Sequence, residues 1–166
     1  MEGSKKNLKE YLETEGLIFP KEPIKEFYSQ IFKLSGFGIG GIMNISGKKA
    51  GSVGAKIVKK MIDNEEELKD LNKIFSYIKE FFEETNICKN ITFKTNNSDI
   101  EFFIENSIFA EAVSGSKKPV CIPLSGAVSG FLEEITGEKW ECKETSCMSQ
   151  GHEKCSFSVK RKKSIF

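Results

Sequence analysis

The amino-acid sequence predicts an α+β fold in which helices pack on an antiparallel sheet. Apolar residues at helical spacing fill most of the first half of the chain. Two pairs of short segments with strand-like alternation follow, and each pair is joined by a turn or a short loop. Such pairs are hairpins, whose strands run antiparallel. One helical pattern separates the two pairs, so the order is helices, hairpin, helix, hairpin.

The length of 166 residues suits one domain with one core. We see no internal repeat and no linker that would divide the chain. We therefore expect a single domain over residues 1–166, with a flexible tail at residues 1–6.

Two helices are expected near the start. Apolar residues three and four positions apart predict a short helix over residues 8–12, which Pro20 and Pro23 separate from the next element. Residues 24–34 then carry an amphipathic helical stripe.

The next segments are less regular. Residues 37–54 are rich in glycine and apolar side chains, and we interpret them as a strand or an irregular crossing, with a short helix at residues 55–62. Asn64 followed by Glu67 has the pattern of a capping box, which predicts a long amphipathic helix that runs to about Glu84.

The first hairpin is predicted from residues 87–95 and 100–104, which flank an Asn96-Asn97 turn signal. A polar connection over residues 111–118 leads to the last three elements. These are a helix at residues 124–136 that ends at Gly137, and two strands at residues 139–144 and 156–160.

Opposite charges nearly balance, since 25 Lys and Arg face 24 Asp and Glu. Nucleic-acid-binding surfaces are strongly basic, so this balance argues against a nucleic-acid partner. No apolar run reaches the roughly 20 residues of a membrane span, and the charged start lacks the apolar core of a signal peptide. We expect a cytoplasmic protein, whose five cysteines act as ligands, core residues or reactive groups. Disulfides stay open only for the case of a hyperthermophile.

Four cysteines crowd into the last third of the chain with the spacing C-x20-C-x4-C-x7-C. Because this is not the C-x2-C pair of a zinc finger or ribbon, spacing alone leaves metal binding and simple burial as equal alternatives. Side chains alternate along a strand. A metal at the mouth of the last hairpin can therefore gather Glu144, Cys147 and Cys155, with Cys121 arriving from the helix start. Three thiolates and one carboxylate can complete a tetrahedral zinc site.

The remaining candidates rank lower. Cys142 lies beside Trp140 and is expected in the core, although it stays a substitute ligand. Cys88, in an early strand, is also expected in the core. His152 is the single histidine and ranks below the cysteines as a ligand.

The segment that begins at Pro119, PVCIPLSGAVSGFLEEITGEKWECKETSCMSQGHEKCSFSV, resembles the C-terminal signature of the 4-vinyl-reductase-like domain family. That signature has a Cys before a small-residue helix, then a Glu, a Cys, a Gly-His or Gly-Asp pair and a final Cys-x-Phe. The segment IEFFIENSIFAEA at residues 100–112 is similar to the strand ahead of it. The resemblance covers about the last third of the chain and marks residues 119–160 as the signature segment.

The resemblance implies a small-molecule-binding domain. Members serve as aromatic-sensing regions of bacterial transcription activators, and the fold is distantly similar to subunits of the TRAPP vesicle-tethering complex. In sensor members three cysteines and a glutamate bind zinc, and by motif these positions fall on Cys121, Glu144, Cys147 and Cys155. Phenol sensing is not implied, because the pocket His and Trp of phenol sensors have no counterpart outside the motif region here.

Two glycine patterns have alternative interpretations. Gly126 and Gly130 share one helix face, which either lets another element approach or leaves space for a hydrophobic ligand. Gly36, Gly38 and Gly41 fit G-x-G-x-x-G, but the preceding segment has a helical period, so a dinucleotide site is not expected. We expect these glycines to provide permissive backbone at a crossing or a dimer contact.

The preferred function is a hydrophobic-ligand-binding or hydrocarbon-binding sensor module with a structural zinc ion. Because no ATPase or DNA-binding region follows in this sequence, its output would pass through a protein partner. The alternatives are a homodimeric assembly or scaffold subunit and, below it, a reductase-type enzyme. An enzyme would need an open metal position or a redox cofactor, and no catalytic residues are proposed.

Overall fold

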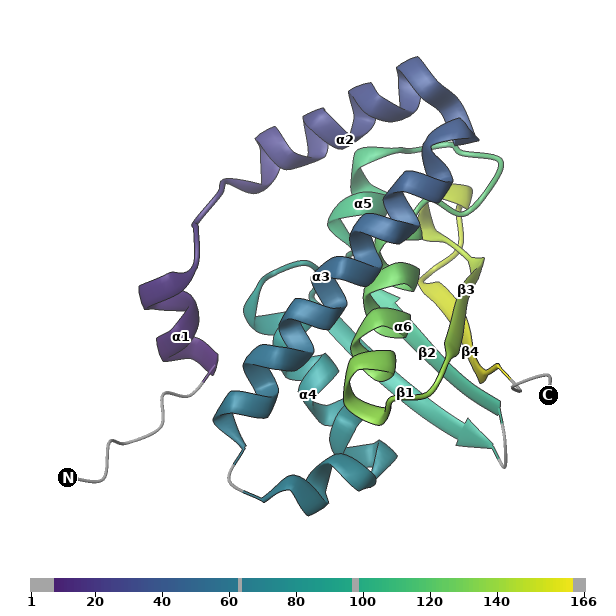
Figure 1. The fold of residues 1–166 in the computed structure, drawn as a ribbon. Coiled ribbons are helices and arrows are strands. Elements are labelled where there is room, and N and C mark those ends of the chain that lie inside the picture. Colours follow the sequence, from purple (N-terminus) through teal and green to yellow (C-terminus); the bar gives the residue numbers. More distant parts are fainter. Residues whose placement is uncertain (1–7, 63, 97–98, 163–166) are drawn as a thin grey trace.

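The computed structural model describes residues 8–62, 64–96 and 99–162 of the chain. Four strands form one antiparallel sheet in the order β1-β2-β4-β3, and helices lie against it (Figure 1). The elements are, in chain order, α1 (Leu8–Glu15), α2 (Lys21–Ser35), the 3-10 helix η1 (Gly36–Ile39), α3 (Gly40–Met61), η2 (Glu65–Lys69), α4 (Leu71–Glu84), β1 (Asn90–Asn96), β2 (Asp99–Glu105), α5 (Ile108–Ala112), α6 (Ile122–Thr136), β3 (Trp140–Ser146), η3 (Met148–Gln150) and β4 (Cys155–Arg161). The predicted α+β class is confirmed.

The sheet joins the two hairpins through their inner strands. β2 pairs with β4, so that Phe102 stands opposite Phe157, and their rings stack with centroids 4.2 Å apart. In β3 and β4 buried and exposed side chains alternate, because one face of the sheet is covered by helices. Part of the Asn96-Asn97 turn signal lies outside the described residues.

The glycine-rich segment forms the long helix α3, so the expectation of a strand or irregular crossing over residues 37–54 is wrong. Glycine is a poor helix former in isolation, but here it permits contact with α6. A Cβ atom at Gly47 would lie 2.1 Å from the carbonyl oxygen of Pro123, and one at Gly51 would lie 1.9 Å from that of Ala127. Two helix backbones therefore touch along a seam that no side chain can enter.

The α6 side of this seam answers the question left open for its glycines. A Cβ atom at Gly126 would lie 2.2 Å from the carbonyl oxygen of Asn44, and one at Gly130 would lie 2.1 Å from that of Lys48. The space beside these two glycines is filled by the backbone of α3. Of the two alternatives, close approach of another element is the correct one, and this helix face holds no ligand space.

Three other details differ from the prediction. Asn64 caps a helical turn by accepting the N–H of Glu66 at 3.1 Å, but that turn is η2, and Asp70 then caps α4 separately. The polar connection expected at residues 111–118 begins inside the short helix α5. Gly36 follows α2 with φ of 52°, and no strand precedes it in the described chain, which agrees with the rejection of a dinucleotide site.

The N-terminal elements attach to the body along one side of α2. Tyr28 and Phe32 are buried, and the Tyr28 ring lies 4.8 Å from that of Phe109 in α5. The Tyr28 hydroxyl donates a hydrogen bond to the carbonyl oxygen of Val120, 2.5 Å away. The other sides of α2 and the segment before it face outward (Figure 1).

In the described part of the chain, none of the helices is both long and apolar enough to cross a membrane.

Candidate metal centre

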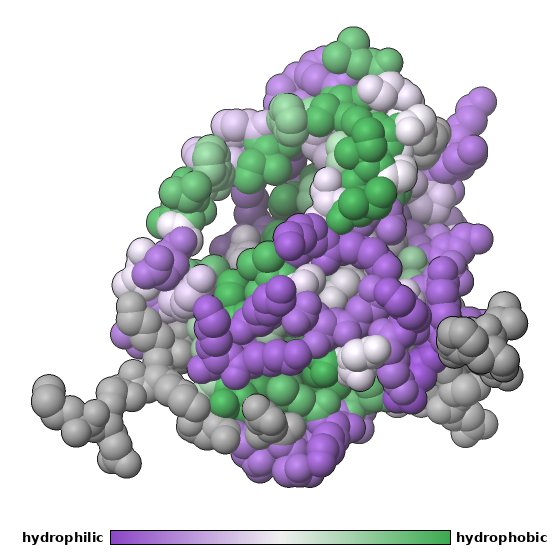
Figure 2. Space-filling model, viewed as in Figure 1, coloured by the Kyte–Doolittle hydropathy of each residue, from purple (hydrophilic) through white to green (hydrophobic). Residues whose placement is uncertain are grey.

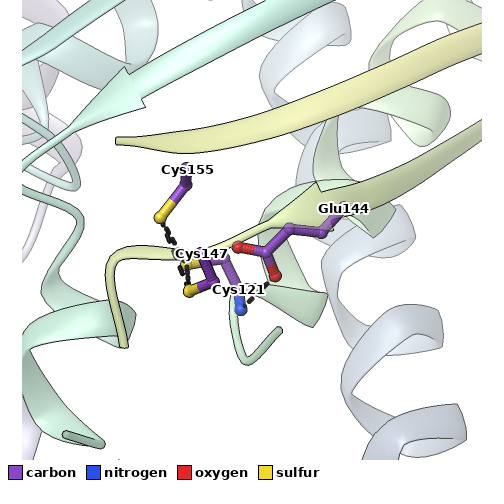
Figure 3. A group of neighbouring side chains, drawn as sticks. All are labelled: Cys121, Glu144, Cys147 and Cys155. Carbon is purple, nitrogen blue, oxygen red and sulfur yellow. Dashed lines mark hydrogen bonds between the residues drawn. The ribbon is translucent and has the colours of Figure 1, made fainter. Parts of the chain in front are cut away.

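Three short pieces of chain bring Cys121, Glu144, Cys147 and Cys155 together (Figure 3). Cys121 is the residue that precedes α6, Glu144 lies in β3, and Cys155 opens β4. Cys147 follows directly after β3, where a register shift between β3 and β4 marks a bulge. All four side chains are buried, and their ligand atoms lie within 4.8 Å of one another.

The three sulfur atoms form a nearly equilateral triangle. The Sγ atom of Cys121 lies 3.8 Å from that of Cys147 and 3.7 Å from that of Cys155, and the last two are 3.5 Å apart. Tetrahedral zinc with Zn–S bonds of about 2.3 Å would place its sulfur ligands about 3.8 Å apart. A disulfide would need about 2.0 Å. The triangle therefore has the edge length that one tetrahedral cation requires.

Glu144 supplies an oxygen donor beside the triangle. Its Oε2 atom accepts the backbone N–H of Cys121 at 2.7 Å, which orients the carboxylate. Its Oε1 atom is buried and has no hydrogen-bond partner among the described residues. Buried polar atoms nearly always have a partner. A metal ion next to the three sulfur atoms would supply the one that Oε1 lacks.

The electrostatics favour a positive charge at this point. Hydrogen bonds from Cys121 and Cys155 hold the pKa of the Cys147 thiol far below its usual range. The Ser149 hydroxyl donates to the same sulfur at 3.2 Å. Burial, together with the nearby Cys147 sulfur, raises the pKa of Glu144 to about 9. Burial also raises the pKa of the Cys121 thiol. Negative charge is thus confined to one sulfur until a cation stabilises more of it.

Residues outside the four-membered cluster lie where the sequence ranked them. Cys142 is buried on the core face of β3 but does not join the cluster, and burial raises the pKa of its thiol. Cys88 is buried in the core, and burial raises its pKa to about 12. His152 is exposed. The substitute ligands considered from the sequence are therefore not part of the cluster.

Sequence reasoning missed the groups that surround the sulfur atoms. The Ser107 hydroxyl lies 3.3 Å from the Cys121 sulfur, and the backbone N–H of Met148 donates to the Cys155 sulfur at 3.3 Å. Only Ser149 carried a signal, since it follows Cys147 by two residues. Ser107 comes from another loop, and a backbone N–H has no signature in the sequence.

Comparison with known proteins agrees with this geometry. Residues 100–161 match the family model of the vinyl-4-reductase domain. This match contains all four cluster residues and confirms the family resemblance found in the sequence. No curated protein matches the chain.

Three solved structures share the fold of this chain. The phenol-responsive sensory domain of the transcription activator PoxR, solved with phenol, has a TM-score of 0.72 and 17% identity, and the match covers 87% of this chain and 76% of that one. A vinyl-4-reductase family protein from Methanocaldococcus jannaschii has a TM-score of 0.62 and 21% identity, covering 94% and 89%. A trafficking protein particle complex subunit 3 from Naegleria fowleri, covalently bound to palmitic acid, has a TM-score of 0.68 and 14% identity, covering 88% and 97%.

Proposed function

We propose that this protein is a small-molecule-binding module whose C-terminal hairpin is fixed by a structural zinc ion. The supporting observation is the buried cluster of three thiols and one carboxylate, with sulfur atoms at the separation that tetrahedral zinc needs. Cys121, Glu144, Cys147 and Cys155 would each provide one ligand. Four protein ligands leave no open coordination position, which favours a structural ion over the alternative of a reductase-type enzyme.

Native mass spectrometry of the purified chain tests the zinc proposal. We expect one zinc ion per chain, lost in Cys147→Ser. Cys142→Ala is the matched control, because this cysteine is also buried in the same hairpin but lies outside the cluster. Zinc retained in Cys147→Ser, or lost in Cys142→Ala, would contradict the assignment of ligands.

The ligand proposed for this module is a hydrophobic small molecule. Two of the structural neighbours carry such compounds, phenol and palmitic acid. In this chain a hollow of about 440 Å³ lies between α5 and η3, next to the metal loop. Its walls are more apolar than polar and include the side chains of Ala110 and Met148. We infer that this hollow receives the small molecule, since apolar concave surfaces are the usual form of such sites.

Calorimetric titration with phenol and with palmitate tests this site. Ser114→Trp would fill part of the hollow and should abolish binding of the compound that the wild-type protein takes up. Ser76→Trp, on an exposed position of α4, is the control and should bind normally. Equal binding by both variants would place the ligand elsewhere, and no binding of either compound by the wild-type protein would contradict this class of ligand.

A homodimeric assembly or scaffold subunit is the second candidate. The observation that favours it is a run of large apolar side chains left exposed on the N-terminal elements. Leu17 is 85% exposed, Ile18 95% and Leu34 85%. Output through a protein partner would use the same module in either case.

A further inference from the structure

α2 carries an apolar stripe that no other described element covers. Its members follow a 3-4-3 spacing: Ile24, Phe27, Ile31 and Leu34. Phe27 is 68% exposed and Leu34 is 85% exposed, whereas Ile24 and Ile31 are half-buried. The residues that hold α2 to the body, Tyr28 and Phe32, lie to one side of this stripe. The apolar arc of α2 is thus wider than its contact with the body.

The 3-4-3 spacing is the pattern of a helix that packs lengthwise against another helix. A second copy of this chain offers the same helix with the same spacing. A two-fold axis near the middle of α2, at Ser29, would set Ile24 against Leu34 of the other copy and Phe27 against Ile31. Such self-complementary contacts are those of a symmetric dimer.

The charges beside the stripe select the antiparallel arrangement. Glu26 and Lys33 flank the stripe on its free side, at nearly equal distances from Ser29. In an antiparallel pair Glu26 of each copy meets Lys33 of the other, which gives two attractive contacts. A parallel pair would place like charges side by side, at a cost.

The remaining exposed apolar residues fit the same arrangement. The linker before α2 exposes Leu17, Ile18 and Phe19, and the first turns of α3 expose Ile42 and Ile45. Antiparallel pairing brings the start of α2 in one copy to the end of α2 in the other, where α3 begins. Figure 2 shows hydrophobic residues along the arch of α2 and over the adjoining part of the body.

The accessible surface is also larger than a compact monomer needs. The chain exposes 10356 Å² at a mass of 18.7 kDa, whereas a monomer of this mass exposes about 8,300 Å². The excess of about 2,000 Å² lies in the range that each subunit of a permanent homodimer buries, about 1,000 to 2,500 Å².

We propose that the protein forms a two-fold dimer in which α2 pairs antiparallel with α2 of a second copy, with Glu26 beside Lys33 of that copy, while the Leu17–Phe19 linker covers Ile42 and Ile45 of that copy. The inference names the partner in the second candidate function and rests on it. It does not depend on zinc, because the stripe and the cysteine cluster share no residue.

Sedimentation equilibrium of the full chain tests the dimer. We expect twice 18.7 kDa for the wild-type protein, and a monomer for the double variant Phe27→Glu/Leu34→Glu. Val53→Glu is the matched control, because Val53 is 46% exposed on α3 but lies away from the paired helices, and it should stay dimeric. A zinc measurement on every variant shows that the fold is retained.

Charge exchange tests the orientation. Glu26→Lys or Lys33→Glu alone should weaken the dimer about tenfold, and the double variant Glu26→Lys/Lys33→Glu should restore the wild-type dissociation constant. A wild-type monomer would overturn both the second candidate function and this surface. A dimer indifferent to Phe27→Glu/Leu34→Glu, or no recovery in the charge-exchanged double variant, would overturn the α2 pairing alone.

Discussion

The cysteine cluster and the outer side of α2 differ in how completely the chain itself satisfies them. In the cluster every ligand atom is buried, and one carboxylate oxygen lacks a partner among the described residues. Along α2 and its linker, large apolar side chains face solvent. An orphaned polar atom among thiols points to a cation, whereas exposed apolar side chains at helix-pairing spacing point to another helix. One molecule thus shows two unfilled positions, and each is specific about what would fill it.

Tyr28 joins the two regions. It holds α2 to the body, and its hydroxyl donates to the carbonyl oxygen of Val120, the residue that precedes the ligand Cys121. A disturbance of the metal loop is therefore transmitted most directly to this attachment. The experiments below disturb one region and measure the other.

Removal of the metal should have the largest effect. Structural zinc contributes on the order of 10 kcal/mol to the folding of small zinc domains. A strong chelator should lower the melting temperature sharply and should expose the backbone amides of β3, β4 and the start of α6 to hydrogen exchange. The amides of α1, which contacts α4 rather than the metal loop, should change least. Uniform loss of protection along the chain would show that the two regions are one cooperative unit.

A change in the α3–α6 seam should rank second. Gly51→Ala places a Cβ atom where the carbonyl oxygen of Ala127 lies 1.9 Å away, so the helices must move apart. We expect a loss of about 3 kcal/mol in the free energy of unfolding, measured by denaturant titration.

The control for this seam is Gly41→Ala in the first turn of α3, where a new Cβ atom would meet nothing within 4 Å. It should leave stability unchanged or raise it by up to about 1 kcal/mol. Equal effects of the two substitutions would mean that the seam tolerates a side chain.

Loss of the Tyr28 hydroxyl should have a moderate effect. Tyr28→Phe keeps the ring contacts but leaves the Val120 carbonyl oxygen without this donor, at a cost of about 1 to 3 kcal/mol. Hydrogen exchange should accelerate in α2 and in the loop that contains Cys121. Phe32→Leu, a change on the same side of α2 that removes no hydroxyl, serves as the comparison and should leave the Cys121 loop protected.

The pH dependence of zinc binding should be the mildest effect per step. Without metal the pKa of Glu144 is raised to about 9, and that of Cys121 is also raised, so both groups hold protons near neutral pH. Zinc must displace these protons, and this competition weakens as the pH rises. Affinity should therefore increase between about pH 6 and about pH 8, by about 1.4 kcal/mol per pH unit for each proton released. Competition titration with a zinc indicator measures it, and a flat profile would show that the ligands are already deprotonated.

The sequence could predict the cluster because its logic is local. Glu144 follows the alternation of one strand, Cys155 opens the next, and Cys147 lies in the loop between them. Cys121 needed only the start of the helix that packs beside them. The family resemblance selected the same four residues independently.

The sequence could not predict α3 because the reason for that helix lies elsewhere in the chain. Gly47 and Gly51 weaken a helix in isolation, and only the backbone of α6 beside them makes the glycines necessary. The break at Asp70 was missed for a related reason, since the periodicity on both sides of it is helical and only the second cap divides η2 from α4.

The central claim is that three thiolates and one carboxylate of this chain hold a single zinc ion. X-ray absorption at the zinc edge tests it most directly, because sulfur and oxygen neighbours differ in distance and scattering. The account predicts three sulfur atoms at about 2.3 Å and one oxygen atom at about 2.0 to 2.2 Å, with no water ligand. A shell of four sulfur atoms would bring Cys142 into the site, and a shell of nitrogen and oxygen alone would remove the cysteines from it; either result would contradict the account.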